Sequence, residues 1–595
     1  MSHALRCFNI RRRLPWLCLP LVLATASRAD EPSWIVRSTD GLVAADHAEA
    51  SAIGAAALRA GGNAFDAAVA TSFALTICRP ESTGVGGGGF MVAYRARDRR
   101  FIALDYREMA PAAATAERYA RLAADAPRGE SPSIHGGNAV GVPGLVAGLA
   151  EIHRQFGSQP WETLVKPAAE LADRGFAVDD TTLGGVREAV REIDAHPAAR
   201  ERYAALRARL LKDGAPRPVG SRWKRADLAA TLRRIADGGA AAFYEGELAA
   251  AIVDTVNRAD GVMTLDDLRR YQVKERTPLR AAFEQFEIVS MPPPSSGGVC
   301  LFEALNVLRA TAANIEGGIA GAARSDRYPP MLVHALRHAF ADRARWLGDS
   351  DFSRVPVDAL VSAAYAQRLA AKSIDDDESF GSRDIPGEPE RPQPDRGGRQ
   401  LPDDGGTSHF CVADREGNFV ALTETINGGY GSWLVVEPFG VILNNQMDDF
   451  TTVPGAANLF GLQQGDANLV APAKRPLSSM SPTLVLRDGT PVLALGASGG
   501  PRIITAVMQV LLNVVVLERP LHEAIDAPRL HHQWKPNEVY FDRPPRDADV
   551  EALRAAGLKL SEKRRGGVVQ AIQRLRDGSL AGASDPRKGG RPARP

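Results

Sequence analysis

The stretch from Gly405 to Asp414 constrains this chain most, because a segment that cannot pack ends there and a strand begins. Residues 375–406 hold four consecutive acidic residues, five prolines and few large apolar side chains, which predicts a disordered tail. From Thr407 on, side chains alternate between two faces, a turn falls at 414–418, and alternation resumes over 419–425. The pattern predicts a β-hairpin whose first strand begins at a threonine.

A threonine hydroxyl becomes a useful nucleophile only when a base lies beside it. One solution is the free α-amine of the same residue, which titrates near ~7.7 to 8.0. Thr407 has such an amine only if the bond from Gly406 is cut, and Thr407 could cut it by attacking the Gly406 carbonyl, which no side chain shields. By itself the stretch favours a plainer interpretation, a turn that leads into an ordinary strand.

Five motifs that follow change this interpretation. They are Asn444 to Phe450, Lys474 to Pro482, Gly496 to Arg502, Ala527 to Trp534 and Gly582 to Arg587. Together they closely resemble the small subunit of the γ-glutamyltranspeptidases, and the resemblance extends from about residue 35 to about residue 590.

The resemblance implies an α+β fold, a four-layer αββα sandwich of the N-terminal-nucleophile hydrolase type. Two fragments of one autoprocessed precursor would build it jointly as a heterodimer, a large subunit of residues 30–406 and a small catalytic subunit of residues 407–595. Neither fragment is expected to fold alone, because the sheets would need strands from both.

The resemblance also implies the catalytic groups. Thr407 would be the nucleophile and, through its amine, the general base, and Thr425 would form a hydrogen bond to it. The backbone N–H groups of Gly499 and Gly500 would form the oxyanion hole. Without the resemblance, Thr425 is an ordinary strand residue, and the glycine pair is typical of a turn.

The donor-binding residues follow from the two charges of a γ-glutamyl group. Those implied to hold its α-carboxylate are Arg107, Ser478 and Ser479, and those implied to receive its α-ammonium are Asn427, Gln446 and Asp449. A planar arginine fork suits a carboxylate. Without the resemblance, Arg107 would be interpreted as a surface arginine after a strand. Asp449 would be interpreted as an aspartate in a turn or at a helix cap.

A lid over the site is expected from Pro454 to Asp466. The usual lid tyrosine of the bacterial family members is Phe460 here, so the hydroxyl that would bond Asn427 is missing. Residues 428–431 also depart from the family pattern, being three glycines and a tyrosine. These changes affect lid closure and acceptor preference.

In the implied reaction, Thr407 takes the γ-glutamyl group from glutathione or a related amide, and cysteinylglycine or another amine leaves. Water, an amino acid or a peptide then collects the acyl group, and no metal or organic cofactor is implied. The same framework supports acylases of glutaryl β-lactams and depolymerases of poly-γ-glutamate, although Asp449 favours a donor that bears an ammonium group. An unprocessed secreted binding protein without catalysis is a more remote alternative.

Residues 1–29 are typical of a secretory signal, with an arginine-rich start, a thirteen-residue apolar run and a small-residue cleavage site. A spanning helix needs ~20 apolar residues, so no stable membrane span is expected, with an uncleaved anchor as the alternative. The mature protein is therefore expected to be periplasmic or secreted. A net charge of +1 gives no footprint for nucleic acid.

The first half of the chain carries less chemistry. Helices are expected over 48–59 and from 65 to about 75, then a glycine-rich loop, then strands over 90–95 and 101–106. Gly84, Gly86 and Gly89 satisfy G-x-G-x-x-G, but a helix precedes them and a strand follows, which is the reverse of a dinucleotide site. The glycines are expected to let the backbone pass close to the active centre.

The remaining expectations are structural. The stretch from Gly141 to about Ala371 is expected to be a helical cover. His334 and His338 lack the glutamate of a zinc protease motif and are expected to be solvated or capping residues. The three cysteines beyond the signal, at positions 78, 300 and 411, have neither disulfide nor metal spacing and are expected to be buried.

Overall fold

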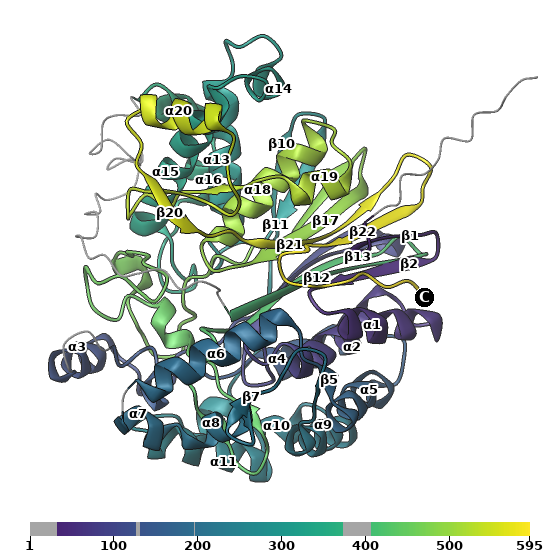
Figure 1. Ribbon diagram of the computed structural model, residues 1–595, viewed down its shortest axis with the longest axis vertical. Coiled ribbons are helices and arrows are strands. Elements are labelled where there is room, and N and C mark those ends of the chain that lie inside the picture. Colours follow the sequence, from purple (N-terminus) through teal and green to yellow (C-terminus); the bar gives the residue numbers. More distant parts are fainter. Residues whose placement is uncertain (1–31, 127–130, 196, 373–405) are drawn as a thin grey trace, which may run out of the picture. The chain divides into compact units, whose positions relative to one another are not determined.

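Two antiparallel β-sheets lie at the centre of this protein in a computed structural model (Figure 1), which describes residues 32–126, 131–195, 197–372 and 406–595. The six-stranded sheet has the order β2 (Gly41–Ala45), β12 (Gly406–Asp414), β13 (Phe419–Asn427), β3 (Gly88–Arg95), β4 (Arg100–Tyr106) and β9 (Lys274–Arg276). The seven-stranded sheet has the order β1 (Ile35–Ser38), β22 (Leu580–Ser584), β21 (Val568–Arg574), β17 (Thr490–Ser498), β16 (Thr483–Arg487), β11 (Phe286–Ser290) and β10 (Leu279–Phe283). The expected signal and most of the expected tail lie outside the described residues.

The predicted hairpin is confirmed as β12 and β13. The two strands are antiparallel, and Thr407 lies opposite Thr425 in their register. The turn closes where the Asp414 amide donates to the Asn418 carbonyl, and the Asp414 carboxylate accepts from the Asn418 amide. Alternate residues of β12 enter two different apolar clusters: Phe410 packs beneath the six-stranded sheet and residues 411 and 413 pack between the sheets.

Both sheets combine strands from either side of residue 406. In the six-stranded sheet, β12 and β13 lie between β2 and β3, and in the other sheet β1 pairs with β22 and β11 pairs with β16. A strand inside a sheet needs a neighbouring strand on each side to satisfy its backbone N–H and C=O groups. Residues before and after 406 therefore complete one another in each sheet, as expected.

Helices cover the outer face of each sheet (Figure 1). Those against the six-stranded sheet include α1 (Ala48–Arg59), α2 (Ala64–Cys78) and α4 (Leu145–Phe156), and α5 (Trp161–Arg174) packs on α2. Those against the seven-stranded sheet include α13 (Gly297–Thr311) and α18 (Arg502–Val515), and α15 (Tyr328–Trp346) packs on α13. The result is four layers, helix, sheet, sheet and helix, with apolar side chains filling each interface.

The first two helices confirm the sequence prediction, and α2 continues to Cys78. Asn63 caps α2 by accepting from the amides of Phe65 and Asp66, and the Asp66 side chain accepts from the Asn63 amide in return. Every side chain of α2 is buried. Small residues therefore suit this helix, because it lies between a sheet and other helices.

The glycine-rich loop lies against β13, as expected. A methyl group on Gly87 would lie 2.1 Å from the Thr425 carbonyl oxygen, and one on Gly89 would lie 2.5 Å from the Thr423 carbonyl oxygen. Any larger residue would push the start of β3 away from β13. The glycines thus set how closely the two strands approach beside Thr425.

Two expectations are wrong. The stretch from Gly141 to Ala371 is not wholly helical, because β9, β10 and β11 lie within it and two of them extend the seven-stranded sheet. His334 and His338 are neither solvated nor capping. They lie in the interior of α15 with 4% and 0% of their surface exposed, and burial lowers their pKa to about 4 and about 2.

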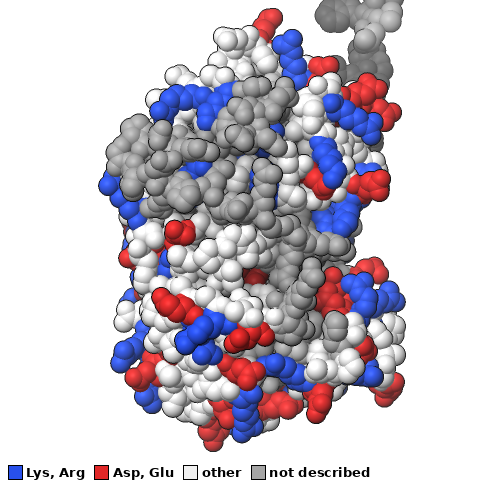
Figure 2. All heavy atoms as spheres, turned by 90° about the vertical axis from the view of Figure 1, so that its left-hand side faces the viewer, with Lys and Arg blue, Asp and Glu red and all other residues white. Residues whose placement is uncertain are grey.

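The remaining features agree with the sequence. Cys78, Cys300 and Cys411 are buried free thiols, as expected. In the part of the chain that is described, no helix has the length and apolar character needed to cross a bilayer. On the face drawn in Figure 2, Lys and Arg are interspersed with Asp and Glu, in keeping with a net charge of +1.

Candidate active site

A pair of threonine hydroxyls lies at the start of the central hairpin. Thr407 is the second residue of β12, Thr425 lies opposite on β13, and their Oγ1 atoms are 3.2 Å apart. Both side chains are buried. The hairpin register alone brings them together, since directly opposed residues of antiparallel strands have neighbouring side chains.

The proton of each hydroxyl can be placed by counting donors and acceptors. The Thr425 hydroxyl donates to the Gly406 carbonyl oxygen at 2.5 Å and accepts from the Asn427 amide at 2.8 Å. A hydroxyl has one proton and two acceptor positions. Since the Thr425 proton is already used, the Thr407 hydroxyl is the donor in the contact between the two threonines. One hydrogen-bonded chain therefore runs from Thr407 through Thr425 to the Gly406 carbonyl.

The peptide after Thr407 is held from the C-terminal end of the protein. Lys588 Nζ donates to the Thr407 carbonyl oxygen at 2.7 Å and to Ser82 Oγ at 3.0 Å, and it forms an ion pair with Asp46 at 3.1 Å. Lys588 is 1% exposed. Its position fixes the main chain on one side of Thr407, and the Thr425 hydroxyl fixes it on the other.

A cavity of about 20 Å³, which is room for about one water molecule, lies beside the two threonines. Nine residues implied by the sequence line it: Arg107, Thr407, Thr425, Asn427, Asp449, Phe460, Ser478, Ser479 and Gly500. The other lining residues are Arg343, Leu462, Leu477, Met480, Pro501 and Ile503. Three predicted residues do not line the cavity but adjoin residues that do: Gln446 donates to Asp449, Gly499 precedes Gly500 and Gly406 precedes Thr407.

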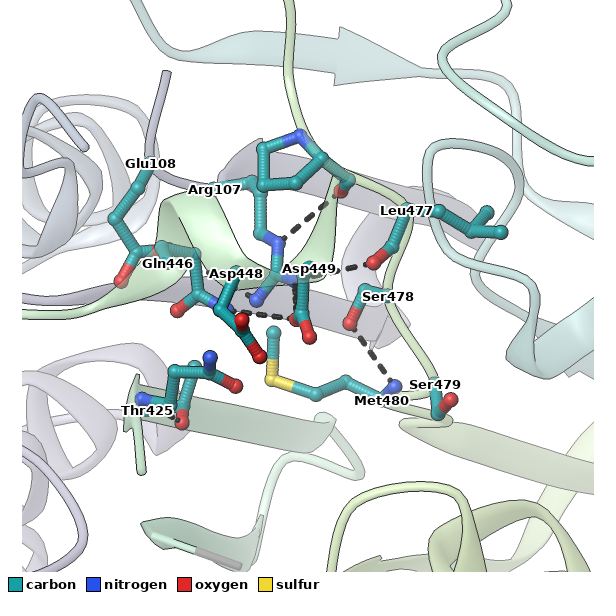
Figure 3. A network of polar contacts seen from close by, with 12 residues as sticks. Arg107, Glu108, Thr425, Gln446, Asp448, Asp449, Leu477, Ser478, Ser479 and Met480 are labelled. Atoms are coloured by element: carbon teal, nitrogen blue, oxygen red, sulfur yellow. Dashed lines mark hydrogen bonds and ion pairs between the residues drawn. The ribbon is translucent and has the colours of Figure 1, made fainter. Parts of the chain in front are cut away.

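An ion pair crosses one end of this cavity (Figure 3). Arg107 donates to Asp449 Oδ2 at 2.5 Å, and Gln446 Nε2 donates to the same oxygen at 2.8 Å. Burial raises the pKa of Asp449, while the neighbouring Arg107 lowers it. The sequence assigned Arg107 and Asp449 to opposite charges of a ligand, and in this structure they bind each other.

Asn458 adds a third hydrogen bond to this carboxylate. Its Nδ2 donates to Asp449 Oδ1 at 3.3 Å, and its Oδ1 accepts from the amides of Phe460 and Leu462. The expected lid segment is therefore tied directly to Asp449. The Phe460 ring lies over Gly500, since a methyl group on that glycine would be 2.7 Å from the ring.

Two serines line the same cavity and directly follow Leu477, whose carbonyl oxygen accepts from Arg107 at 3.3 Å. Ser478 Oγ accepts from the Met480 amide at 3.1 Å, and Ser479 Oγ accepts from Arg343 at 3.4 Å. Among the described residues, neither hydroxyl finds an acceptor for its own proton. Both protons are therefore available to an anion in the cavity.

The glycine pair lies between β17 and α18 in a backbone conformation that favours glycine, with φ of 125° at Gly499 and 58° at Gly500. In the described part of the chain, no acceptor takes a hydrogen bond from either amide. Arg502 Nε donates to the Gly499 carbonyl oxygen at 2.8 Å. A charged donor on this carbonyl polarises the peptide whose N–H belongs to Gly500.

Sequence reasoning missed three buried charged residues at this site, Glu108, Arg343 and Lys588. Burial raises the pKa of Glu108 to about 8, and its Oε2 is 3.9 Å from Arg107. Glu108 follows a predicted site residue, and Lys588 directly follows the last of the five motifs, so both had a signal. Arg343, in the middle of a helix, had none.

The described residues contain no group of three or more His, Cys, Asp or Glu side chains arranged to hold a metal ion. What the site offers is a threonine hydroxyl, free backbone amides and a cavity with charged groups at its end. This set can carry out acyl transfer, in which a hydroxyl attacks a carbonyl and amides stabilise the oxyanion.

A four-layer αββα sandwich with a threonine at the start of a central strand is the architecture of the N-terminal-nucleophile hydrolases. The chain belongs to one family within this class: residues 50–594 match the family described as Gamma-glutamyltranspeptidase.

The chain is 38% identical to the glutathione hydrolase proenzyme of Escherichia coli (strain K12) over 553 residues, which is 93% of this chain and 91% of that protein. It is also 38% identical to the glutathione hydrolase proenzyme of Pseudomonas aeruginosa over 96% of this chain and 98% of that protein. The crystal structure of cephalosporin acylase from Bacillus halodurans is similar in fold, with a TM-score of 0.78 and 25% identity, and the match covers 97% of this chain and 99% of that one.

Proposed function

We propose that this chain is the precursor of a glutathione hydrolase and γ-glutamyltransferase whose nucleophile is Thr407. The observation that carries the proposal is the chain of hydroxyls from Thr407 through Thr425 to the Gly406 carbonyl oxygen. In this proposal the network joins the nucleophile, a proton path and the carbonyl to be attacked, and its short hydrogen bonds support these roles. The names of the relatives in Escherichia coli and Pseudomonas aeruginosa supply the substrate.

Maturation would begin with attack of Thr407 Oγ1 on the Gly406 carbonyl carbon. As the new C–O bond forms, the Thr407 hydroxyl proton passes to Thr425, and the Thr425 proton moves toward the Gly406 oxygen, where negative charge develops. The bond to the Thr407 nitrogen then breaks as the proton at the Gly406 oxygen passes to that nitrogen, which leaves an ester between Gly406 and Thr407 Oγ1 and a free α-amine. Water hydrolyses the ester and releases residue 406 as the end of the large fragment.

In the mature enzyme, the α-amine of Thr407 would act as the general base for its own hydroxyl. The hydroxyl attacks the γ-carbonyl of the donor, and the amides of Gly499 and Gly500 bind the oxyanion. The amine portion leaves with a proton, and water or an amino group of an acceptor then attacks the acyl-enzyme. Each step uses groups of the chain itself.

Donor binding would use two sets of polar groups that line the cavity. Ser478 and Ser479 have hydroxyl protons available for the α-carboxylate, with Arg107 nearby, and Asp449 has an acceptor position left on Oδ1 for the α-ammonium. The free cavity holds only about one water molecule. The Phe460 segment must therefore shift when a donor enters.

A second candidate is acylase activity on glutaryl β-lactams, which the similarity to the cephalosporin acylase of Bacillus halodurans favours. A glutaryl donor has no ammonium group and would leave the remaining acceptor position on Asp449 Oδ1 unfilled. Measuring p-nitroaniline release from L-γ-glutamyl and glutaryl p-nitroanilide compares the two activities directly. Faster release from the γ-glutamyl compound supports our proposal, and a glutaryl preference would replace it.

The experiment on glutathione itself uses the purified full-length protein and its Thr407→Ala variant. The expected result is release of cysteinylglycine by the wild type, transfer of glutamate to an added dipeptide, and neither product from the variant. Turnover by the variant at the wild-type rate would refute the role of Thr407. We also propose export by residues 1–29, which cell fractionation of the tagged protein tests.

A further inference from the structure

A second cavity, of about 260 Å³, lies among the helices on the outer side of the six-stranded sheet (Figure 1) and shares no lining residue with the cavity beside Thr407. The elements that form it are α8 (Ala204–Leu210), β8 (Arg222–Trp223), the start of α9 (Ala226–Gly238) and β15 (Val441–Ile442). Four of its lining side chains are cations: Arg209, Arg217, Lys224 and Arg225. Positive charge gathered in a hollow attracts an anion.

Only Arg209 is paired with acids. Asp227 is the one carboxylate that lines the cavity, and its Oδ2 accepts from Arg209 Nε at 3.2 Å and from Arg209 NH2 at 3.0 Å. Its Oδ1 accepts from the Leu228 amide at 2.8 Å. Arg209 also donates to Glu437 Oε1 at 2.9 Å. Two carboxylates therefore bind one of the four cations.

The other three cations have no acidic partner in the described part of the chain. Arg217, Lys224 and Arg225 form no ion pair with any residue there. Arg217 donates to backbone carbonyl oxygens at the end of α8 at 2.9 and 3.0 Å, and its guanidinium lies 4.8 Å from the centre of the Trp223 ring. Burial lowers the pKa of Arg217 despite the attraction of Asp213. The cavity thus has three positive charges that no ion pair balances.

Arg225 is the most deeply buried of the three, with 9% of its surface exposed. It donates to the carbonyl oxygens of Thr76 at 2.8 Å and Gly440 at 3.4 Å. Burial lowers its pKa to about 10 although Asp227 and Glu81 attract it, so the guanidinium stays cationic at neutral pH. A buried cation whose charge is not compensated costs folding energy, and a bound anion lowers that cost.

The start of α9 adds hydrogen-bond donors to this charge. Ala226 and Asp227 line the cavity, and their backbone amides donate to no acceptor among the described residues. No side chain caps the helix, since Arg225 occupies the N-cap position. Free amides at a helix N-terminus favour negative charge, and guanidinium groups bind phosphate oxygens in pairs. This combination of donors around a hollow suits a phosphate group.

We propose that this cavity is a binding site for a phosphate group, either inorganic phosphate or the phosphate of a small monoester. Arg217, Lys224 and Arg225 neutralise its charge, and the first amides of α9 bind its oxygens. The ligand also stabilises the folded chain, because Arg225 joins the end of α2 to the turn before β15. The site uses no residue of the proposed hydrolase, so it goes beyond that function and does not depend on it.

Calorimetric titration of the purified protein with sodium phosphate, and separately with glycerol 3-phosphate, measures binding at a constant ionic strength set with NaCl. We expect one site per chain and a higher melting temperature than in NaCl alone. Arg217→Gln combined with Lys224→Gln should raise the Kd at least about tenfold, or about 1.4 kcal/mol. The compound that binds more tightly shows whether the site takes free phosphate or an ester.

The matched control combines Arg327→Gln with Lys563→Gln, which removes an exposed arginine and an exposed lysine outside the cavity. It loses the same net charge without changing the site, so it should bind phosphate as the wild type does. Melting in NaCl alone shows whether each variant folds. If the site variant does not fold, Lys224→Gln alone makes the comparison, because this side chain is exposed, and it should raise the Kd about threefold.

Two results would overturn the inference. One is a wild type that binds neither compound beyond the effect of ionic strength, and the other is an equal loss of affinity in the site variant and the control. Either result leaves the proposed function unaffected, because γ-glutamyl anilide hydrolysis is measured separately. A loss of phosphate binding that is confined to the site variant supports the inference.

Discussion

Replacing Thr425 with Val tests whether its hydroxyl promotes cleavage of the precursor. Valine has nearly the shape of threonine but cannot donate to the Gly406 carbonyl oxygen, which now accepts this hydrogen bond at 2.5 Å. A neutral hydrogen bond contributes about 0.5–1.5 kcal/mol to stability. A donor aimed at a developing oxyanion is worth about 2.7–4 kcal/mol, or roughly 100- to 1000-fold in rate. We therefore expect cleavage to slow by roughly 100-fold or more.

The same change also lowers folding stability, and this effect can be measured separately from the cleavage rate. The Asn427 amide loses its acceptor, the Thr425 oxygen at 2.8 Å. An unpaired buried amide costs about 1–3 kcal/mol of folding stability. This cost falls on the intact precursor and on its transition state alike, so it lowers the melting temperature without slowing cleavage.

The assay follows the loss of full-length chain on a denaturing gel after rapid purification. Thr423→Val is the matched control, because Thr423 is buried on the same face of β13 and contacts His409 Nδ1 at 2.8 Å instead of residue 406. Thr425→Ser keeps the hydroxyl and should restore most of the rate. Cleavage of Thr425→Val within about threefold of the wild type, or an equal delay in Thr423→Val, would refute the reasoning.

Three further predictions concern the lid, the oxyanion hole and pH. Phe460 and Asn427 line the same cavity, so Phe460→Tyr adds a hydroxyl on the side chain that lies over the site. We expect a higher ratio of transfer to hydrolysis, measured with a dipeptide acceptor. An unchanged ratio would argue against a lid contact. Arg502→Lys removes the planar donor to the Gly499 carbonyl, and kcat should fall about tenfold or more at constant KM, as expected for a loss of about 1.4 kcal/mol of transition-state stabilisation; a change in KM alone would contradict this. Burial raises the pKa of Glu424 from 4.5 to about 8, so the folded state holds a proton that the unfolded chain releases, and stability falls between those pH values by about 1.4 kcal/mol per pH unit. Glu424→Gln should remove that share of the decline, which melting curves at pH 5 and pH 8 measure. A variant that loses as much stability between these two pH values as the wild type would disprove the prediction.

The central hairpin could be predicted from the sequence because its signals are local. Alternation over residues 407–413, a turn at 414–418 and a second alternating run predict both strands. The register that places Thr425 opposite Thr407 comes from the structure. The layers and most of the cavity-lining residues came from the family resemblance, since no local pattern brings residues so far apart in the chain together.

What could not be predicted depends on contacts between distant residues. Arg107 and Asp449 are 342 positions apart, and nothing in either neighbourhood indicates that they form an ion pair. The short strands β10 and β11 lie in a helix-rich stretch and become strands because β16 offers an edge to pair with. His334 is buried because of what packs on its helix, which its spacing to His338 does not reveal.

Intact mass and N-terminal sequencing of the purified wild-type protein test the central claim most directly, namely that the Thr407 hydroxyl becomes reactive when its residue becomes a chain end. The account predicts two fragments, with the smaller beginning at Thr407 and carrying all γ-glutamyl anilide hydrolysis in complex with the larger. A fully active chain that stays whole, or one cut at any other bond, would contradict it.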